Sequence, residues 1–198
     1  MTDINICIIM MTSRIGTLYK KDFDKSFDKN VKLHYLLWCD KNLIKYLLNN
    51  KINGIVLSGS KYRILDKKRK IADLSKKILK INIPILGICY GYQWLIKNTC
   101  GKKCLDNFRN RYNKLNEYGK FITISKPFKV NRTKYLLSHH DYITKVPKNW
   151  KVLIKTGDQI WMAYNKKSKI LGVQFHPEYF KKTRKYFFRK WIKYICKK

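Results

Sequence analysis

Apolar residues along the chain fall into two patterns, and each predicts a different kind of element. Short runs of β-branched and other apolar residues predict buried strands. These runs cover 4–10, 32–38, 52–57, 83–88, 121–124, 135–137, 152–154, 160–164 and 170–175. Apolar residues at helical spacing predict amphipathic helices. Such spacing occurs in a short stretch within 12–30 and over 43–48, 70–80, 90–98 and 181–196.

The order of these elements predicts the fold class. Strands alternate with helices in the first half of the chain, and short strands dominate the second half. This order is typical of an α/β protein, here a three-layer sandwich with a mainly parallel central sheet and a small antiparallel extension. No linker and no repeat interrupts the sequence, so we expect a single domain over residues 1–198.

Composition narrows the class of protein. Hydrophobic residues make up 45% of the chain, enough to bury a full core and to exclude disorder as the main state. No apolar run approaches the ~20 residues of a membrane span, and the first residues show no signal-peptide pattern. We therefore expect a cytoplasmic protein with reduced cysteines. Cys100 and Cys104 lack a second Cys/His pair at ligand spacing, so no metal site is expected.

The charge balance is far from neutral. Lys and Arg number 45 against 12 Asp and Glu, a net charge of +33. Such a chain is expected to bind nucleic acid non-specifically and in a salt-dependent way. The basic residues are spread along the whole sequence and accompany no recognised DNA or RNA motif, which favours solvated faces over a dedicated binding surface.

The segment 87–91 (GICYG) predicts a reactive cysteine. It joins a predicted strand to a predicted helix, and a nucleophile between two glycines at such a junction is typical of a nucleophile elbow. A helix N-terminus lowers the pKa of a thiol and favours the thiolate. The N–H of the following residue, Tyr90, can help to hold an oxyanion. A buried structural cysteine is the alternative interpretation of Cys89.

A second candidate lies downstream, where the strand 170–175 ends in His176-Pro177-Glu178. Glu178 can orient and stabilise His176, and His176 can serve Cys89 as base and acid. The chain has only two glutamates, and Glu178 is one of them. A surface histidine beside an exposed glutamate is the alternative for this pair taken alone.

Together these segments resemble the class I, triad-type glutamine amidotransferases. Residues 87–93 (GICYGYQ) resemble the nucleophile motif of the family, and 174–178 (QFHPE) resemble its His/Glu motif, in the same order and at about the same spacing. The resemblance implies a flavodoxin-like α/β fold, a catalytic triad and no cofactor. It assigns the triad to Cys89, His176 and Glu178, which would hydrolyse glutamine to glutamate and ammonia through a thioester.

The resemblance also implies two groups of binding residues. An oxyanion hole would form from backbone N–H groups of Tyr90, Gly59 and Ser60. The α-groups of glutamine would be held by Gln93, His140 and Asp141.

Several details resemble the GMP synthase branch of the family. They are Tyr90 after the nucleophile, 117–119 (EYG), and 138–141 (SHHD) in place of a Ser-His-Gly-Asp loop. Three segments depart from that pattern: 10–14 (MMTSR), the loop 58–61 (SGSK) and 179–181 (YFK). The chain carries no ATP-gripping glycine loop, so the resemblance implies a separate ATP-dependent synthetase, of the GMP synthase ATP-pyrophosphatase type, as partner.

Two other functions remain open from the sequence. The same triad could serve a stand-alone hydrolase of γ-glutamyl peptides or amides, which would prefer such conjugates to free glutamine. The net charge leaves a basic nucleic-acid-binding protein as the third and least favoured interpretation.

Overall fold

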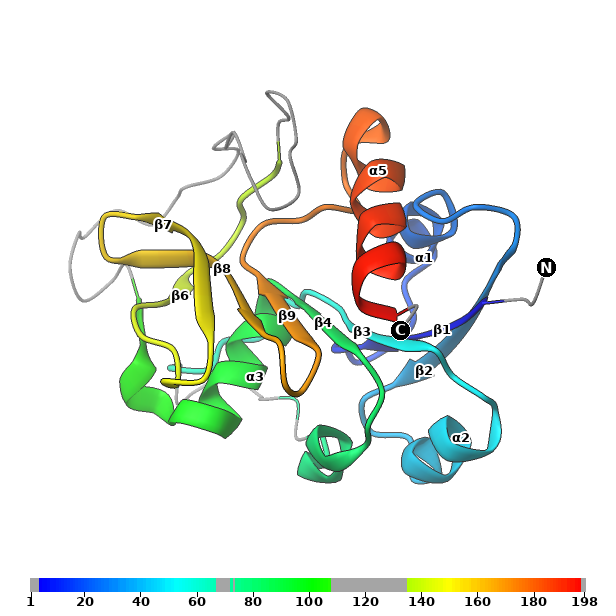
Figure 1. Ribbon diagram of the computed structural model, residues 1–198, viewed down its shortest axis with the longest axis horizontal. Coiled ribbons are helices and arrows are strands. Elements are labelled where there is room, and N and C mark those ends of the chain that lie inside the picture. The colour runs from blue at the N-terminus through cyan, green and yellow to red at the C-terminus, as the bar shows by residue number, and fades with distance from the viewer. Residues whose placement is uncertain (1–3, 67–71, 73, 108–134, 197–198) are drawn as a thin grey trace.

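A seven-stranded sheet forms the centre of the computed structural model, which describes residues 4–66, 72, 74–107 and 135–196 (Figure 1). In spatial order the strands are β2 (Val31–Leu37), β1 (Ile4–Met10), β3 (Gly54–Leu57), β4 (Ile85–Ile88), β9 (Ile170–Val173), β8 (Gln159–Asn165) and β7 (Lys151–Thr156). The first five run parallel, and β8 and β7 continue the sheet antiparallel. Because β3, β4 and β9 are parallel neighbours, the loops that leave their carboxyl ends meet at one edge.

Helices cover both faces of this sheet. Figure 1 shows α1 (Thr17–Asp24) and α5 (Lys181–Trp191) on one face, and α2 (Leu43–Asn49) and α3 (Tyr90–Cys100) on the other. Alternate residues of β1 point to opposite faces, as the period of a strand requires. Ile9 joins the core under α2 and α3, whereas Ile8 joins the core under α1 and α5. The three-layer α/β sandwich predicted from the sequence is confirmed.

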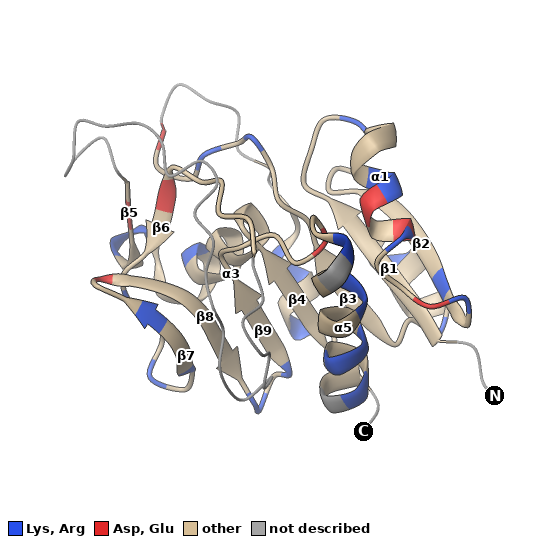
Figure 2. Cartoon of the chain, turned by 90° about the horizontal axis from the view of Figure 1, so that it is seen from above, with Lys and Arg blue, Asp and Glu red and all other residues tan. Residues whose placement is uncertain are grey.

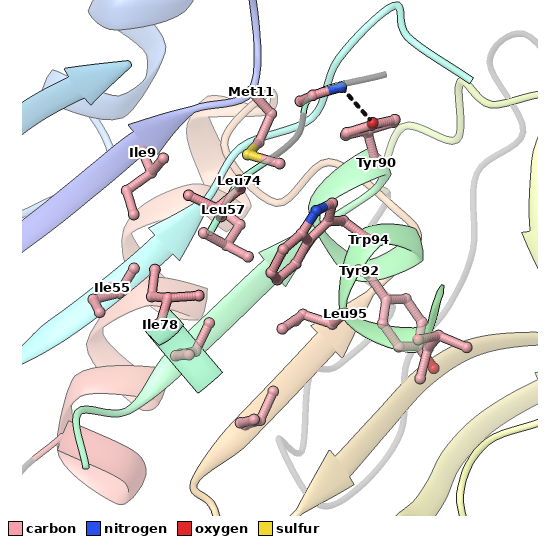
Figure 3. Close-up of a cluster of buried hydrophobic side chains, with 14 of the residues drawn as sticks. Ile9, Met11, Ile55, Leu57, Leu74, Ile78, Tyr90, Tyr92, Trp94 and Leu95 are labelled. Atoms are coloured by element: carbon pink, nitrogen blue, oxygen red, sulfur yellow. Dashed lines mark hydrogen bonds between the residues drawn. The ribbon is translucent and has the colours of Figure 1, made fainter. Parts of the chain in front are cut away.

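The core beneath α3 fixes the start of that helix. Trp94 and Leu95 from α3 pack with Ile55 and Leu57 of β3, and all four are buried (Figure 3). Tyr90 is also fully buried, and its hydroxyl accepts a hydrogen bond from the Ala72 N–H at 3.0 Å. The first turn of α3 is therefore held from below by the sheet and from the side by the segment at residue 72.

A two-stranded antiparallel sheet stands beside the main one. It pairs β5 (Leu105–Asn107) with β6 (Asp141–Ile143), and Asn107 lies opposite Asp141. The predicted antiparallel extension is thus confirmed, through β8 and β7 in the main sheet and through this second sheet.

Two predicted elements differ from the structure. In place of a helix over 70–80, the described residues form only a 3₁₀ turn, Lys76–Lys80, which begins where the Ser75 side chain accepts the Lys77 N–H. The Ala72 N–H is bonded to a side chain rather than to a helical carbonyl. Within the described residues the segment 135–137 is not a strand; Leu136 makes an isolated antiparallel bridge to His176, next to the turn 177–179. The predicted strand 121–124 lies outside the described residues.

The expectation of reduced cysteines is wrong for one pair. Cys100, the last residue of α3, forms a disulfide with Cys104, and their Cα atoms are 6.1 Å apart. Cys104 then leads into β5. The bridge therefore ties the end of α3 to the start of the small sheet.

Charged side chains lie on the outside of these layers. Figure 2 shows Lys and Arg on α5, α1 and the β7 hairpin, with few acidic side chains among them. Across the described part of the chain, no helix is long and apolar enough to cross a membrane. Within the same residues no three His, Cys, Asp or Glu side chains group as metal ligands.

Candidate active site

Cys89 occupies the sharp turn between β4 and α3. Its backbone has φ 49° and ψ −106°, a conformation that costs energy for a residue with a side chain. The turn is held on both sides, because the Cys89 N–H donates to Val173 of β9 and its carbonyl accepts the Gln93 N–H. The side chain lies at the cavity wall with 3% of the residue exposed. The predicted elbow is present.

The glycine after the nucleophile allows α3 to approach the sheet. A Cβ on Gly91 would collide with the carbonyl oxygen of Leu57 and would lie 2.7 Å from the Leu57 Cβ. Backbone atoms of a central strand cannot move away cheaply, so any side chain here would displace the helix. The glycine is therefore required by packing at this point of the elbow.

His176 and the buried Glu178 form a hydrogen-bonded pair after the end of β9. The Nδ1 atom of His176 lies 2.7 Å from Oε1 of Glu178, and Glu178 is 1% exposed. An ionised carboxylate only accepts hydrogen bonds, so Nδ1 carries the proton and Nε2 is the second ring nitrogen. The His176 N–H donates to the Leu136 carbonyl, which fixes the backbone beside the ring.

The three predicted triad residues interact electrostatically. Burial alone would lower the pKa of His176, but the charges of Glu178 and Cys89, together with hydrogen bonds to both, raise that pKa well above its ordinary value. A histidine in this environment favours the imidazolium form. The arrangement is that of an activated nucleophile beside an oriented acid and base.

Two further groups face the sulfur of Cys89. Nε2 of the buried Gln174 lies 3.6 Å from Sγ, and the Ser138 carbonyl oxygen lies 3.6 Å from it on another side. The sequence reasoning assigned no role to Gln174. The feature of the sequence that could have indicated Gln174 is its place at the end of an apolar strand, two positions before His176.

A cavity of about 600 Å³ opens in front of these groups. Seven of the nine predicted site residues line it: Cys89, His176, Gly59, Ser60, Gln93, His140 and Asp141. Glu178 lies behind His176. Tyr90 turns its side chain into the core, and only its backbone adjoins the nucleophile. The cavity wall also includes residues that sequence reasoning missed, namely Thr12, Tyr19, Lys61, Tyr62, Arg63 and His139.

The loop after β3 differs from the predicted oxyanion hole in one respect. The Gly59 N–H donates a 2.9 Å hydrogen bond to the hydroxyl of Tyr19, a residue of α1. That N–H is therefore already bonded to Tyr19, which also lines the cavity. Of the predicted set, the N–H groups of Ser60 and Tyr90 stay candidates for the oxyanion hole.

Gln93 and Asp141, two of the predicted glutamine-binding residues, bond to the protein itself. Nε2 of Gln93 donates to the Asp141 carbonyl at 2.5 Å, and Oδ2 of Asp141 accepts the Leu65 N–H at 3.0 Å. Burial raises the pKa of Asp141, while hydrogen bonds from the Leu65 and Ile64 backbone oppose the rise. These side chains hold the loops that frame the cavity. The segment 117–119 lies outside the described residues.

Comparison with known proteins agrees with this geometry. Residues 22–194 match the family model of class-I glutamine amidotransferases. A protein named GMP synthase (glutamine-hydrolyzing) from Wigglesworthia glossinidia brevipalpis is 36% identical over 168 residues, which cover 77% of this chain and 31% of the relative. A protein of the same name from Borreliella burgdorferi is 35% identical over 142 residues, 68% of this chain and 26% of the relative. The chain thus spans about a third of the length of these curated relatives.

Solved structures share the fold. A protein from Thermoplasma acidophilum, assigned as one subunit of GMP synthase, superimposes with a TM-score of 0.72 at 21% identity, over 98% of this chain and 94% of the other. A glutamine amidotransferase from Thermotoga maritima gives a TM-score of 0.58 at 19% identity, over 96% and 83%. With the family model covering most of the sequence, this chain belongs to the class I glutamine amidotransferase family.

Proposed function

We propose that this protein acts as a single glutaminase domain that hydrolyses glutamine and passes the ammonia to a separate synthetase. One observation carries the proposal. The His176–Glu178 pair, joined at 2.7 Å, faces the strained Cys89 elbow at the cavity. This arrangement supplies a nucleophile, a proton carrier and an orienting carboxylate within one site.

In the first half-reaction the Cys89 thiolate attacks the side-chain amide carbon of glutamine. The C=O π bond opens, and negative charge collects on the carbonyl oxygen, where the N–H groups of Tyr90 and Ser60 stabilise it. The imidazolium of His176 donates its Nε2 proton to the amide nitrogen. The C–N bond breaks, ammonia leaves, and a γ-glutamyl thioester remains on Cys89.

In the second half-reaction water takes the place of the amine. Nε2 of His176, now neutral, accepts a proton from water as the oxygen attacks the thioester carbon. The C–S bond breaks, glutamate leaves, and the thiolate–imidazolium pair is restored. Glu178 keeps Nδ1 protonated throughout, so the ring presents the same nitrogen in both steps.

The part of the cavity wall that Gln93, His140 and Asp141 line receives the α-amino and α-carboxyl groups of glutamine. Since Gln93 and Asp141 are bonded to neighbouring backbone, they fix the shape of the wall around the substrate.

The synthesis that uses the ammonia is proposed to be that of GMP from XMP. Most of the length of the relatives named GMP synthase lies outside the part that this chain matches. The Thermoplasma acidophilum neighbour, assigned as one subunit of GMP synthase, is of nearly the same extent as this chain. The subunit name of that neighbour supports a division in which a separate ATP-pyrophosphatase protein performs the synthetase step. The net charge of +33 favours a partner with an acidic facing surface.

Release of glutamate from glutamine tests the glutaminase proposal, with and without a GMP synthase ATP-pyrophosphatase partner. Cys89→Ala should lower the rate by at least about 10⁴-fold, because no other group can form the thioester. Cys39→Ala removes an exposed free thiol and is the matched control, expected to keep full activity. Equal rates for wild type and Cys89→Ala would contradict the proposal. Preference for γ-glutamyl conjugates over glutamine would favour the stand-alone hydrolase.

The GMP proposal has its own test. Wild type plus the ATP-pyrophosphatase partner should make GMP from XMP, ATP and glutamine, and Cys89→Ala should do so only when ammonia replaces glutamine. Glutaminase activity that transfers ammonia to another acceptor, and not to XMP, would leave the first proposal standing and overturn this one.

A further inference from the structure

A tyrosine from the opposite side of the sheet enters the catalytic site. Tyr19 belongs to α1, which covers the face away from α3, and its hydroxyl reaches the edge where β3 and β9 end. The hydroxyl lies 3.1 Å from Oε1 of Glu178 and 2.9 Å from the backbone nitrogen of Gly59. One oxygen atom therefore touches both the acid of the triad and the loop that carries Ser60.

The direction of these two hydrogen bonds is fixed by chemistry. A carboxylate and a backbone N–H leave one arrangement for a phenol between them: its O–H donates to Glu178 and its oxygen accepts from Gly59. Burial, and then the charges of Glu178 and Cys89, raise the pKa of Tyr19 well above its ordinary value. The phenol consequently stays protonated and remains a donor throughout the working pH range.

Glu178 depends on this donor. Its Oε1 receives the hydrogen bonds of both His176 and Tyr19. Its Oε2 is buried, and the described residues offer that oxygen no hydrogen bond. A buried carboxylate is costly unless it is hydrogen-bonded, so each of the two donors contributes strongly to holding Glu178 in place.

We propose that Tyr19 is a positioning residue that holds Glu178 and the Gly59–Ser60 loop in one fixed arrangement. Through Glu178 it orients His176, and through Gly59 it aims the Ser60 N–H at the developing oxyanion. The proposal rests on the proposed glutaminase function, because positioning has a meaning only for that reaction.

The ring of Tyr19 is anchored independently of its hydroxyl. It packs against Phe23 of the same helix with ring centroids 5.1 Å apart, and Phe23 packs on Phe188 of α5. Tyr19→Phe therefore removes the two hydrogen bonds and keeps this packing. Tyr35→Phe is the matched control, since Tyr35 donates a 2.6 Å hydrogen bond to Asp24 of α1, another phenol–carboxylate bond on the same helix but away from the cavity.

Steady-state kinetics with glutamine give the first readout. Tyr19→Phe should lower kcat about tenfold and change KM by less than about twofold, because the lost bonds go to catalytic groups and not to the substrate. Without the hydrogen bond from Tyr19, the negative charge of Glu178 acts on His176 alone. The imidazolium proton is then bound more strongly. The alkaline limb of the plot of kcat against pH should therefore move to higher pH by about half a pH unit. Cys89 and His139 interact electrostatically with His176, and Asp22 interacts electrostatically with Glu178. Tyr19→Phe changes none of these groups.

Alkylation of Cys89 by iodoacetamide gives a readout that needs no turnover. In a Cys39→Ala background Cys89 is the remaining reactive thiol of the described residues, since burial raises the pKa of Cys7 and of Cys196 to about 12. The pH profile of alkylation should shift for Tyr19→Phe and coincide with wild type for Tyr35→Phe. Thermal unfolding should show similar small losses for both variants.

Unchanged kcat and an unchanged alkylation profile in folded Tyr19→Phe would overturn the positioning role. So would equal kinetic losses in Tyr19→Phe and Tyr35→Phe, which would mark a general loss of stability. If wild type releases no glutamate under any condition, the proposed function fails. The alkylation profiles would then still decide whether Tyr19 controls the Cys89–His176 pair.

Discussion

Two sets of residues at the cavity are bonded in different ways: Cys89, His176 and Glu178, called here the catalytic end, and Gln93, His140 and Asp141, called here the proposed glutamine end. At the catalytic end the functional side chains interact with one another: His176 bonds to Glu178, Tyr19 bonds to the same carboxylate, and Cys89 adjoins His176. At the proposed glutamine end the side chains bond mainly to backbone, although Nε2 of Gln93 also donates to Oε1 of Gln174 at 3.4 Å. Gln93 bonds to the Asp141 carbonyl, and Asp141 bonds to the Leu65 N–H.

This difference teaches which property each end controls. Groups that bond mainly to one another set the orientation and protonation of His176 beside Cys89, and strand ends hold these groups in place. Groups that bond to loop backbone hold the loops in place. Substitutions at the catalytic end should therefore change the reaction more than the stability, and substitutions at the glutamine end should do the reverse.

The largest effect is expected at the carboxylate of the triad. Glu178→Gln should lower kcat about 10³-fold, a loss of about 4 kcal/mol in transition-state stabilisation, because the neutral amide cannot fix the His176 proton on Nδ1. Unfolding by urea should show little change, since removing a buried charge offsets the lost hydrogen bonds. Glutamate release measures the loss in kcat, and urea titration measures the free energy of unfolding.

A control separates the site from the surface. Asp28→Asn breaks the ion pair between Asp28 and Arg189 on the outer side of α5 and should keep full activity. If Glu178→Gln retained more than about a tenth of the activity, the catalytic end would not be a coupled unit.

At the glutamine end the expected loss is one of stability. Asp141→Ala leaves the Leu65 N–H buried without its acceptor and should lower the free energy of unfolding by about 3 kcal/mol. Asp141→Asn keeps one carbonyl oxygen and should lose about 1 kcal/mol. Urea titration measures both. A stable Asp141→Ala variant with a raised KM alone would break the comparison, because the side chain would then serve the substrate directly.

Much of the fold could be predicted because its central strands are apolar throughout. β1, β4 and β9 are short β-branched runs that are buried on both sides, as parallel strands are. β5 and β6 were missed because each has three residues, and their pairing joins positions far apart in the sequence. The stripe over 70–80 predicted a helix, but the Tyr90 hydroxyl takes the Ala72 N–H. Local periodicity contains no information on such a tertiary hydrogen bond.

The residues of the site also fall into those that the sequence predicts and those that it does not. Cys89 and the His176–Glu178 pair could be predicted because each lies in a short local motif whose glycines and order fix its geometry. Tyr19 could not, since its bond to Glu178 spans 159 residues and nothing around it in the sequence marks it. The use of the Gly59 N–H by Tyr19, in place of the oxyanion, follows from the same long-range contact.

The loop between the two ends offers a sharper test. A Cβ on Gly59 would lie 2.7 Å from Cε1 of His176 and 3.0 Å from the Tyr19 hydroxyl. Gly59→Ala should therefore push the imidazole out of line and lower kcat about 50-fold, with KM changed less than threefold or so. Gly16→Ala is the matched control, because a Cβ there meets nothing within 4 Å. Equal activity of the two variants would show that the His176 ring adapts.

The smallest expected effect concerns His139, which lies beside Asp141 at the glutamine end. Burial lowers the pKa of His139 from 6.5 to about 3, against a weaker opposing hydrogen bond from its ring to the Asp141 backbone. The folded protein keeps this ring neutral, whereas the unfolded chain binds a proton below pH 6.5, so this group makes stability fall as the pH drops from 6.5 towards 3. Between pH 7 and pH 5 the loss should be about 2 kcal/mol.

His139 and His176 should thus respond to acid in opposite directions. The raised pKa of His176 gives a stabilisation that is complete below its unfolded pKa and is lost only as the pH rises through the folded value. Acidification to pH 5 therefore removes nothing at the catalytic end. Urea titrations at pH 7 and pH 5 should show a difference of about 2 kcal/mol in the free energy of unfolding of wild type. His139→Gln, which cannot be protonated, should not show this difference. Parallel pH dependence in the two proteins would mean that His139 is hydrated in the folded state, and the glutamine end would then be as open to solvent as the cavity mouth.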